Sequence, residues 1–389
     1  MKSIFVSNIK IKNVRHLRNI TIPLSKDTCK HLIFTGKNGS GKTSVLQAIS
    51  NYLNEAVTSD SMTEAAHTHK QYNEASENIT DNISIEFNES VDTVCHHFEK
   101  GHFVLAYYKA ERTFEADVPK HIEKISLQEK YLIDDTPRQL FVKYLVDLKV
   151  TEALARSNEK NQKADEIKKW FTKFQELLRK IFDDETLELV FEEDTFSFFI
   201  KEKNRSTFDF NSLSSGFAAV LDIVLDLIMR MEKTTNRTFD FNIPGIVLID
   251  EIETHLHLDL QKTILELLTG IFPNIQFIVS THSPFILNSL ENAVIYDLEN
   301  NTMVEHGLVN VPYNGIVEGY FQADEMSDIL KRKYERYKNL VKKEHLTDDD
   351  FEEIAELELF LNKIPDYLAL NITTEYQRLK MEFENREDL

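Results

Sequence analysis

Many hydrophobic residues in the first 300 positions fall into short runs of the kind that form β-strands. Residues 32–34, 246–249 and 277–279 are continuous apolar stretches, and strands buried on both faces of a parallel sheet have this composition. Residues 9–11 and 83–87 are further strand-like segments. They belong to residues 1–115, in which apolar and polar residues alternate as they do in strands. The pattern predicts an α/β protein built around buried strands.

Other segments repeat their apolar residues at helical spacing. Residues 217–231 form one predicted helix, on which we expect Asp222 and Asp226 to face solvent. Residues 116–185 also read as helices. One apolar stripe in this region consists of Ile167, Trp170, Phe171, Phe174, Leu177, Leu178 and Ile181. These helices indicate a compact helical lobe inserted between the strand-rich parts.

A glycine-rich turn follows the first apolar run. Residues 36–43 read Gly-Lys-Asn-Gly-Ser-Gly-Lys-Thr, and a predicted helix begins after them. A strand, such a turn and a helix make a phosphate-binding loop, because backbone N–H groups and the helix N-terminus surround an anion. Lys42 is expected to reach the β- and γ-phosphates, and Thr43 to bind Mg²⁺. The predicted nucleotide-binding set in this loop is Gly36, Asn38, Gly39, Ser40, Gly41, Lys42, Thr43 and Ser44.

The second apolar run ends in two carboxylates, Asp250 and Glu251. Ligands bind at the carboxyl ends of parallel strands, so this pair should lie near the phosphates. Asp250 is predicted to join the magnesium shell, and Glu251 to polarise the attacking water as a general base.

Two further polar clusters belong to the same pattern. Ser214, Ser215 and Gly216 open the predicted helix 217–231, where hydroxyls and free N–H groups make a second anion site. His282 follows the third apolar run, and its imidazole could donate to the γ-phosphate or hold the attacking water.

The order of these four motifs resembles that of the ATP-binding-cassette ATPases, within which the chain is similar to the SMC, RecF and OLD-like branch. Residues 248–257 resemble the DEPExHLHP stretch of prokaryotic OLD-like ATPases, and residues 9–17 resemble their opening hairpin. The similarity covers residues 1–115 and 205–300. It implies an SMC-type head: a mixed β-sheet with helices, an antiparallel N-terminal subdomain, a helical insertion and a helical C-terminal tail.

The resemblance also implies a shared active site. Two heads would form a dimer in which each ATP lies between one phosphate loop and the Ser214–Gly216 turn of the other copy. Hydrolysis through Glu251 would then release the dimer. One departure concerns Phe217, which stands where the family usually has Gln or Glu after the signature.

On this basis residues 1–115 are expected to form the first half of the head and residues 116–185 the helical lobe. Residues 186–315 would complete the head, and residues 316–389 would form an acidic helical module. At the entrance to the lobe, the resemblance makes Arg112 a candidate sensor of the γ-phosphate, with a strand-end salt bridge as the alternative.

Composition limits the partners. The chain has 389 residues and a net charge of −20, which argues against a surface covered with DNA contacts. Residues 160–180 nevertheless hold seven Lys/Arg against three Asp/Glu, so this face could contact nucleic acid, although a solvated helix face is the alternative. Two cysteines and no apolar run of membrane-spanning length favour a cytoplasmic protein without a membrane partner.

The C-terminal residues, 316–389, distinguish a nuclease from an ATPase that works with a separate partner. A Toprim nuclease would need strand-end carboxylates, for which Glu318 and the run 348–350 are superficially suitable. Pro312 interrupts the first strand, however, and Thr347 is expected to cap a helix that begins with the acidic run. The tail is therefore expected to dock a partner or another copy of the chain.

These features predict a cytoplasmic ATPase switch that forms a homodimer or higher oligomer and regulates a separately encoded effector, expected to be a nuclease. The chain resembles ATPase subunits of anti-phage systems such as Septu and PARIS, and the role in defence rests on that resemblance. The alternative is a RecF-like clamp that acts directly on DNA.

Overall fold

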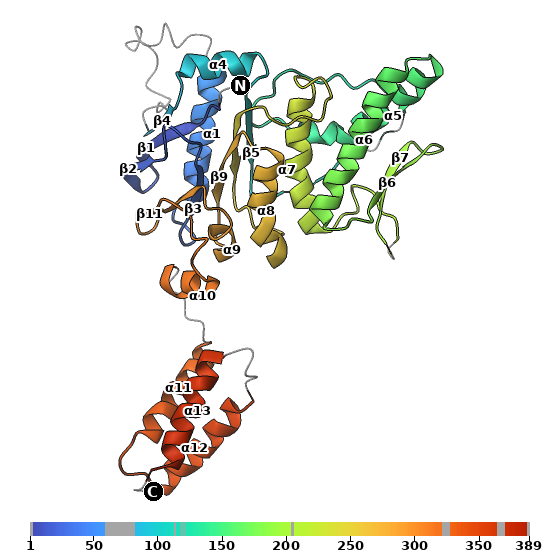
Figure 1. The fold of residues 1–389 in the computed structure, drawn as a ribbon. Helices are drawn as coiled ribbons and strands as arrows, with labels where there is room; N and C mark the ends of the chain where they lie inside the picture. The colour runs from blue at the N-terminus through green and yellow to red at the C-terminus, as the bar shows by residue number, and fades with distance from the viewer. Residues whose placement is uncertain are drawn as a thin grey trace. The chain divides into compact units, whose positions relative to one another are not determined.

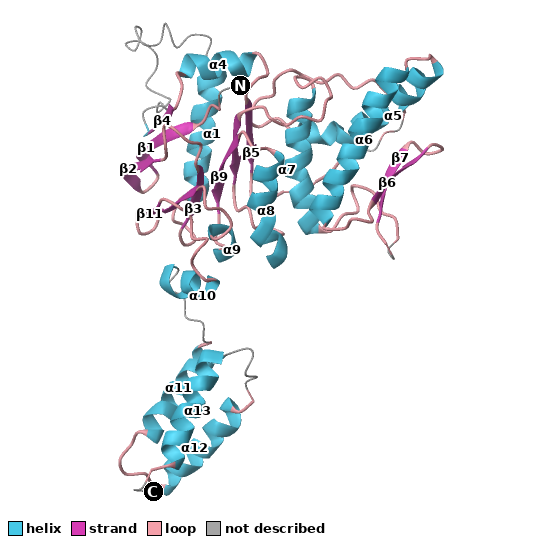
Figure 2. Ribbon diagram, in the orientation of Figure 1, coloured by secondary structure: helices cyan, strands magenta, loops and turns pink. Residues whose placement is uncertain are grey.

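The computed structural model describes residues 3–58, 82–112, 114–117, 119, 121–203, 206–320, 327–363 and 370–386. Contacts divide the chain into two compact units, Met1–Tyr313 and Asn314–Leu389. Figures 1 and 2 show the elements of each unit. No helix in the described ranges combines the length and apolar character that a membrane span requires.

The first unit is organised around a six-stranded sheet. Its strands, in spatial order, are β11 (Thr302–Val304), β10 (Ala293–Asp297), β3 (His31–Thr35), β9 (Ile275–Ser280), β8 (Gly245–Ile249) and β5 (Val104–Tyr108). All neighbours pair in parallel except β11, which is antiparallel to β10. Every residue of the five parallel strands is buried. The predicted α/β class with buried parallel strands is confirmed.

A second, antiparallel sheet is formed by strands from the N-terminal part of the chain. Strands β2 (Leu17–Pro23), β1 (Val6–Val14) and β4 (Ile83–Phe87) form it in that order. Helix α1 (Lys42–Thr58) contributes its apolar face to a core shared by both sheets. The buried Gln276 of β9 ties the sheets together, since its amide donates to Val6 O at 3.0 Å and accepts from Val6 N at 2.7 Å.

The helical lobe is shorter than the sequence predicts. Residues 121–136 contain no helix, and the helical part begins with a 3₁₀ turn at Pro137. Helices α5 (Phe141–Ser157) and α6 (Asn161–Phe182) follow, and then a hairpin of β6 (Glu188–Glu192) and β7 (Ser197–Lys201). Aromatic packing around Trp170, Phe174 and Phe141 explains why these helices stay together.

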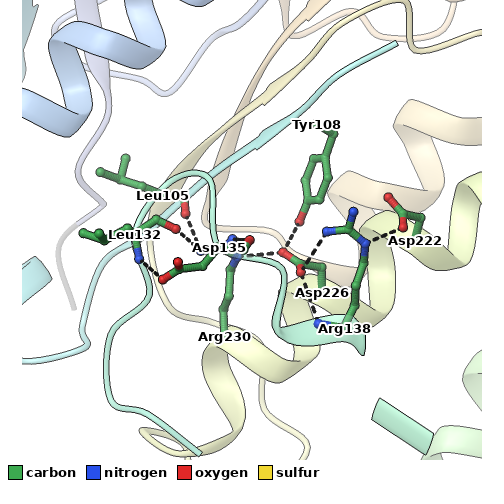
Figure 3. A network of polar contacts seen from close by, with 8 residues as sticks. All are labelled: Leu105, Tyr108, Leu132, Asp135, Arg138, Asp222, Asp226 and Arg230. Atoms are coloured by element: carbon green, nitrogen blue, oxygen red, sulfur yellow. Dashed lines mark hydrogen bonds and ion pairs between the residues drawn. The ribbon is translucent and has the colours of Figure 1, made fainter. Parts of the chain in front are cut away.

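Helix α7 (Ser215–Glu232) is buried along almost its whole length. The expectation that Asp222 and Asp226 face solvent is wrong, because both are fully buried. Asp226 accepts from Tyr108 Oη at 2.8 Å and from Arg230 Nε at 2.7 Å, and Asp222 forms an ion pair with Arg138 (Figure 3). Buried carboxylates require such partners, and here they join α7 to β5 and to the entrance of the lobe.

The remaining helices complete the unit around the sheet. They are α4 (Val91–Glu99), α8 (Leu258–Ile271) and α9 (Pro284–Leu287), and a short helix α10 (Tyr313–Gly315) lies at the boundary of the two units.

The second unit contains α11 (Asp328–Val341), α12 (Asp348–Leu361) and α13 (Leu370–Glu384), which share an apolar core. Thr347 and Asp350 form a capping box at the start of α12, so the acidic run lies at the N-terminus of a helix. Residues 316–320 form a π-helical turn. The residues considered for a Toprim site therefore belong to helical segments, and the described residues of this unit include no strand.

Candidate functional site

The phosphate loop connects β3 to α1. Gly36 and Gly41 have φ values of +130° and +101°, a region that L side chains rarely adopt. A Cβ at Gly36 would lie 2.8 Å from Ser40 Oγ, so the turn is too close for a side chain there. Lys42 is buried and donates from Nζ to Gly36 O at 2.8 Å and to Lys37 O at 3.2 Å. The loop is thus curled around its own lysine.

Ser280, the last residue of β9, orders the acidic pair at the end of β8. Its hydroxyl donates to Asp250 Oδ1 at 2.5 Å and accepts from Glu251 N at 2.8 Å. Asp250 is buried, whereas Glu251 is partly exposed and has a φ of +44°. Among the residues that the structure describes, the Glu251 carboxylate accepts one long hydrogen bond, 3.4 Å from Thr254 Oγ1. It is therefore largely available for chemistry.

The residues after β9 are held by Glu253. Thr281 Oγ1 donates to Glu253 Oε2 at 2.8 Å, and the backbone N of His282 donates to Glu253 Oε1 at 2.5 Å. His282 itself is half-buried. These bonds connect the turn after β8 to the turn after β9.

The electrostatics of this edge are dominated by one lysine and several carboxylates. Burial lowers the pKa of Lys42, although Glu251, Glu253 and Asp250 raise it. Burial, followed by the charge of Lys42, lowers the pKa of His282. The His282 imidazole is therefore neutral near pH 7. The Lys42 amine interacts electrostatically with the carboxylates of Glu251, Glu253 and Asp250.

Arg112 lies behind the acidic turn. Its guanidinium donates to the carbonyl oxygens of Asp250 (2.7 Å), Glu251 (3.0 Å) and Ile252 (3.2 Å), and it also bonds Lys109 O. Arg112 is buried. These contacts support the backbone of the acidic turn, and within the described ranges none of the Arg112 hydrogen bonds goes to a carboxylate.

The Ser214–Gly216 turn lies at the N-terminus of α7. Gly216 packs against the loop after the acidic turn, since a Cβ there would lie 3.2 Å from His255 O. Ser214 and Ser215 are exposed, and in the described part of the chain their hydroxyls form no hydrogen bond. Within the described residues no hydrogen bond joins these hydroxyls to the phosphate loop of the same chain.

A hollow of about 510 Å³ adjoins the phosphate loop. His16 in the turn between β1 and β2 and Arg18 at the start of β2 line it, together with Asn38 and Glu299. Leu17 Cδ1 would lie 3.0 Å from a Cβ at Gly41, so this hairpin covers the loop directly. The hollow has room for the nucleoside part of a ligand.

The parallel sheet brings Lys42, Asp250, Glu251 and His282 to one edge, because β3, β9 and β8 are adjacent and end there. Sequence reasoning did not single out Ser280 or Glu253. Ser280 is a polar residue at the end of an apolar strand, and this position could have indicated that its hydroxyl forms hydrogen bonds. The neighbouring sequence does not indicate that the partners are Asp250 and Glu251.

Two family models match the chain. One, described as "AAA ATPase domain", covers residues 5–143. The other, described as "AAA domain, putative AbiEii toxin, Type IV TA system", covers residues 128–288. Together they include the phosphate loop, the acidic turn and His282. Over these ranges the chain is similar to AAA-type ATPase domains.

Among known proteins, the chain is 26% identical to the Septu protein PtuA of Bacillus mycoides over 403 residues, covering 97% of this chain and 53% of PtuA. It is 31% identical to the "Retron Ec83 probable ATPase" of Escherichia coli over 156 residues, 39% of this chain and 29% of that protein. A 73-residue match to RecF of Rickettsia typhi has 34% identity and covers 18% of this chain and 19% of RecF. The chain thus spans about half of PtuA and less than a third of the retron protein.

Proposed function

We propose that this chain is a magnesium-dependent ATPase that acts as a switch. The observation that carries the proposal is the convergence of Lys42, Asp250, Glu251 and His282 at the ends of three adjacent strands. An amine, two carboxylates and a neutral imidazole are the groups needed to bind a triphosphate and activate water.

The residues present fit MgATP. Ser40 Oγ is buried and has no hydrogen-bond partner among the described residues, and Lys42 already points into the loop that surrounds it. Thr43 and Asp250 would hold Mg²⁺, which would neutralise charge on the phosphates when bound. Gly36, Asn38, Gly39, Gly41 and Ser44 would complete the phosphate site.

Within this site Glu251 would take the proton of the attacking water, because its carboxylate is the least engaged in protein contacts. His282 is neutral by virtue of its lowered pKa and can donate one hydrogen bond to the γ-phosphate. Arg112 would act through the backbone of the acidic turn, although its role as a γ-phosphate sensor stays a prediction.

A second copy would complete the site. Ser214 and Ser215 present exposed hydroxyls, without hydrogen bonds to the described residues, at the positive end of α7, and such a helix N-terminus binds anions. We propose that this turn contacts ATP held by the phosphate loop of another protomer. The head dimer would then depend on the nucleotide, as a switch requires.

We further propose that the switch regulates a separately encoded effector, a nuclease, in anti-phage defence. The support is similarity to a Septu PtuA protein along nearly the whole chain and to a retron ATPase along part of it. The acidic helical unit, Asn314–Leu389, is the proposed docking module, because it forms a compact body with its own core.

The experiment is to purify the chain from its host with ATP and compare wild type with Glu251→Gln. We expect hydrolysis to fall by about 10²–10⁴-fold in the variant while nucleotide binding persists. A nuclease retained at fixed stoichiometry would support the switch. Wild-type protein without ATP hydrolysis, or without a protein partner, would contradict it.

Direct action on DNA is a second candidate. The exposed side chains of Lys168 and Lys169 on α6 and the short match to RecF favour it. A salt-sensitive complex with DNA that weakens when both lysines become Gln would support this function over the effector switch.

A further inference from the structure

We propose that Glu253 is a positioning residue that holds the turn bearing His282 against the acidic turn. This inference rests on the proposed ATPase function. It assigns the two nearby glutamates, Glu251 and Glu253, to different tasks.

The contacts made by Glu253 are bidentate. One carboxylate oxygen accepts the hydroxyl of Thr281 at 2.8 Å, and the other accepts the backbone N–H of His282 at 2.5 Å. Thr281 is fully buried, and its hydroxyl also accepts from Ser283 N at 2.9 Å. Glu253 therefore fixes the main chain at the position from which the imidazole projects.

The turn that carries Glu253 is itself a rigid support. Arg112 binds the three carbonyls of residues 250–252, and Ile252 N donates to Ser280 O at 3.1 Å. With its backbone held on both sides, Glu253 can reach across to the next strand end without moving. A positioning contact is effective only when its own base is fixed in this way.

The same contacts make Glu253 a poorer general base than Glu251. Both of its carboxylate oxygens already accept short hydrogen bonds from the protein, whereas the Glu251 carboxylate accepts a single bond of 3.4 Å within the described part of the chain. A carboxylate that takes a proton from water needs a free lone pair aimed at that water. Glu251 meets this condition better, and Glu253 acts through His282.

The test compares Glu253→Ala, Glu253→Gln, Thr281→Val and Thr281→Ser in the full chain. Glu266→Gln, on the exposed face of α8, is the matched control. We expect Glu253→Ala to lower kcat about 10–100-fold, as small misplacements of catalytic groups do, with the Kd for a non-hydrolysable Mg–ATP analogue nearly unchanged. Thr281→Ser should retain activity where Thr281→Val loses it, and Glu253→Gln should fall between Ala and wild type.

Exchange of the His282 amide hydrogen provides a second readout that does not depend on hydrolysis. It should become faster in Glu253→Ala and stay unchanged in Glu266→Gln. Wild-type kcat in Glu253→Ala would overturn the proposal, as would a loss of activity with no change in His282 exchange. If wild type did not hydrolyse ATP at all, the proposed function would fail, while the amide exchange would still report whether Glu253 holds His282.

Discussion

The ring of Phe217 stacks on the ring of Phe182, with centroids 4.3 Å apart and an interplanar angle of 16°. Phe182 is the last residue of α6, and Phe217 lies in the first turn of α7, directly after the Ser214–Gly216 turn. The phenylalanine that replaces the usual Gln or Glu at position 217 therefore makes a packing contact. The start of α7 is joined to the helical lobe by aromatic packing.

A double-mutant cycle with Phe182→Ala and Phe217→Ala measures this contact. We expect a coupling free energy of about 0.5–1.5 kcal/mol, typical of a packed aromatic pair. Fluorescence of Trp170, the single tryptophan of the chain, can follow denaturant unfolding, because Trp170 donates from Nε1 to Glu232 on α7. Additive effects of the two substitutions would mean that the rings do not stabilise each other.

Arg112→Met should uncouple catalysis from binding. Methionine fills much of the same space but removes the guanidinium hydrogen bonds to the carbonyls of residues 250–252, of which only that of Glu251 keeps another donor among the described residues, Thr254 N. We expect kcat to fall by about 10²-fold through a misplaced acidic turn. The Kd values for ATP and ADP, measured by calorimetry, should change little and by the same factor. A selective loss of ATP affinity would instead identify Arg112 as a sensor of the γ-phosphate.

The shared active site predicts complementation between two inactive variants. Lys42→Ala removes the phosphate-loop amine, and Ser215→Arg blocks the exposed turn at the start of α7. Mixed one to one, they should recover about a quarter of wild-type ATPase activity, because half of the dimers are mixed and each holds one intact site. The measurement is the steady-state rate against mixing ratio, and each variant alone serves as control. No recovery at any ratio would contradict a site built from two copies.

Asp222 predicts a pH dependence of stability. Burial raises its pKa to about 6, although the Arg138 guanidinium opposes the rise. Because the folded pKa exceeds the unfolded value, the native state binds this proton more tightly, and the stabilisation present at low pH is lost as pH rises toward 6. Relative to Asp222→Asn, the free energy of unfolding of wild type should fall by about 2 kcal/mol between pH 4 and pH 7.

Denaturant titrations followed by Trp170 fluorescence at several pH values provide the measurement. Asp350→Asn in the second unit is the control, since it should leave this pH dependence of the first unit unaltered. A constant difference between wild type and Asp222→Asn from pH 4 to pH 7 would show that Asp222 titrates normally.

The parts of this protein that the sequence alone determined are local. Continuous apolar runs predicted β3, β8 and β9, because a strand buried on both faces has no polar side to show. The glycine-rich phosphate loop and the helix cap at Thr347 could also be predicted from the sequence, because the geometry of each depends on residues next to it in the chain. The ends of those strands then indicated which groups would meet at one edge of the sheet.

Only the tertiary structure decided which side chains hold that edge in place. Asp222 and Asp226 appear as polar positions on a helix, but other elements cover α7 on all sides and supply Arg138 and Tyr108 as partners. Ser280 and Glu253 likewise acquire their roles from groups about 30 residues away. Such pairings depend on how strands and helices pack together, and no local periodicity encodes them.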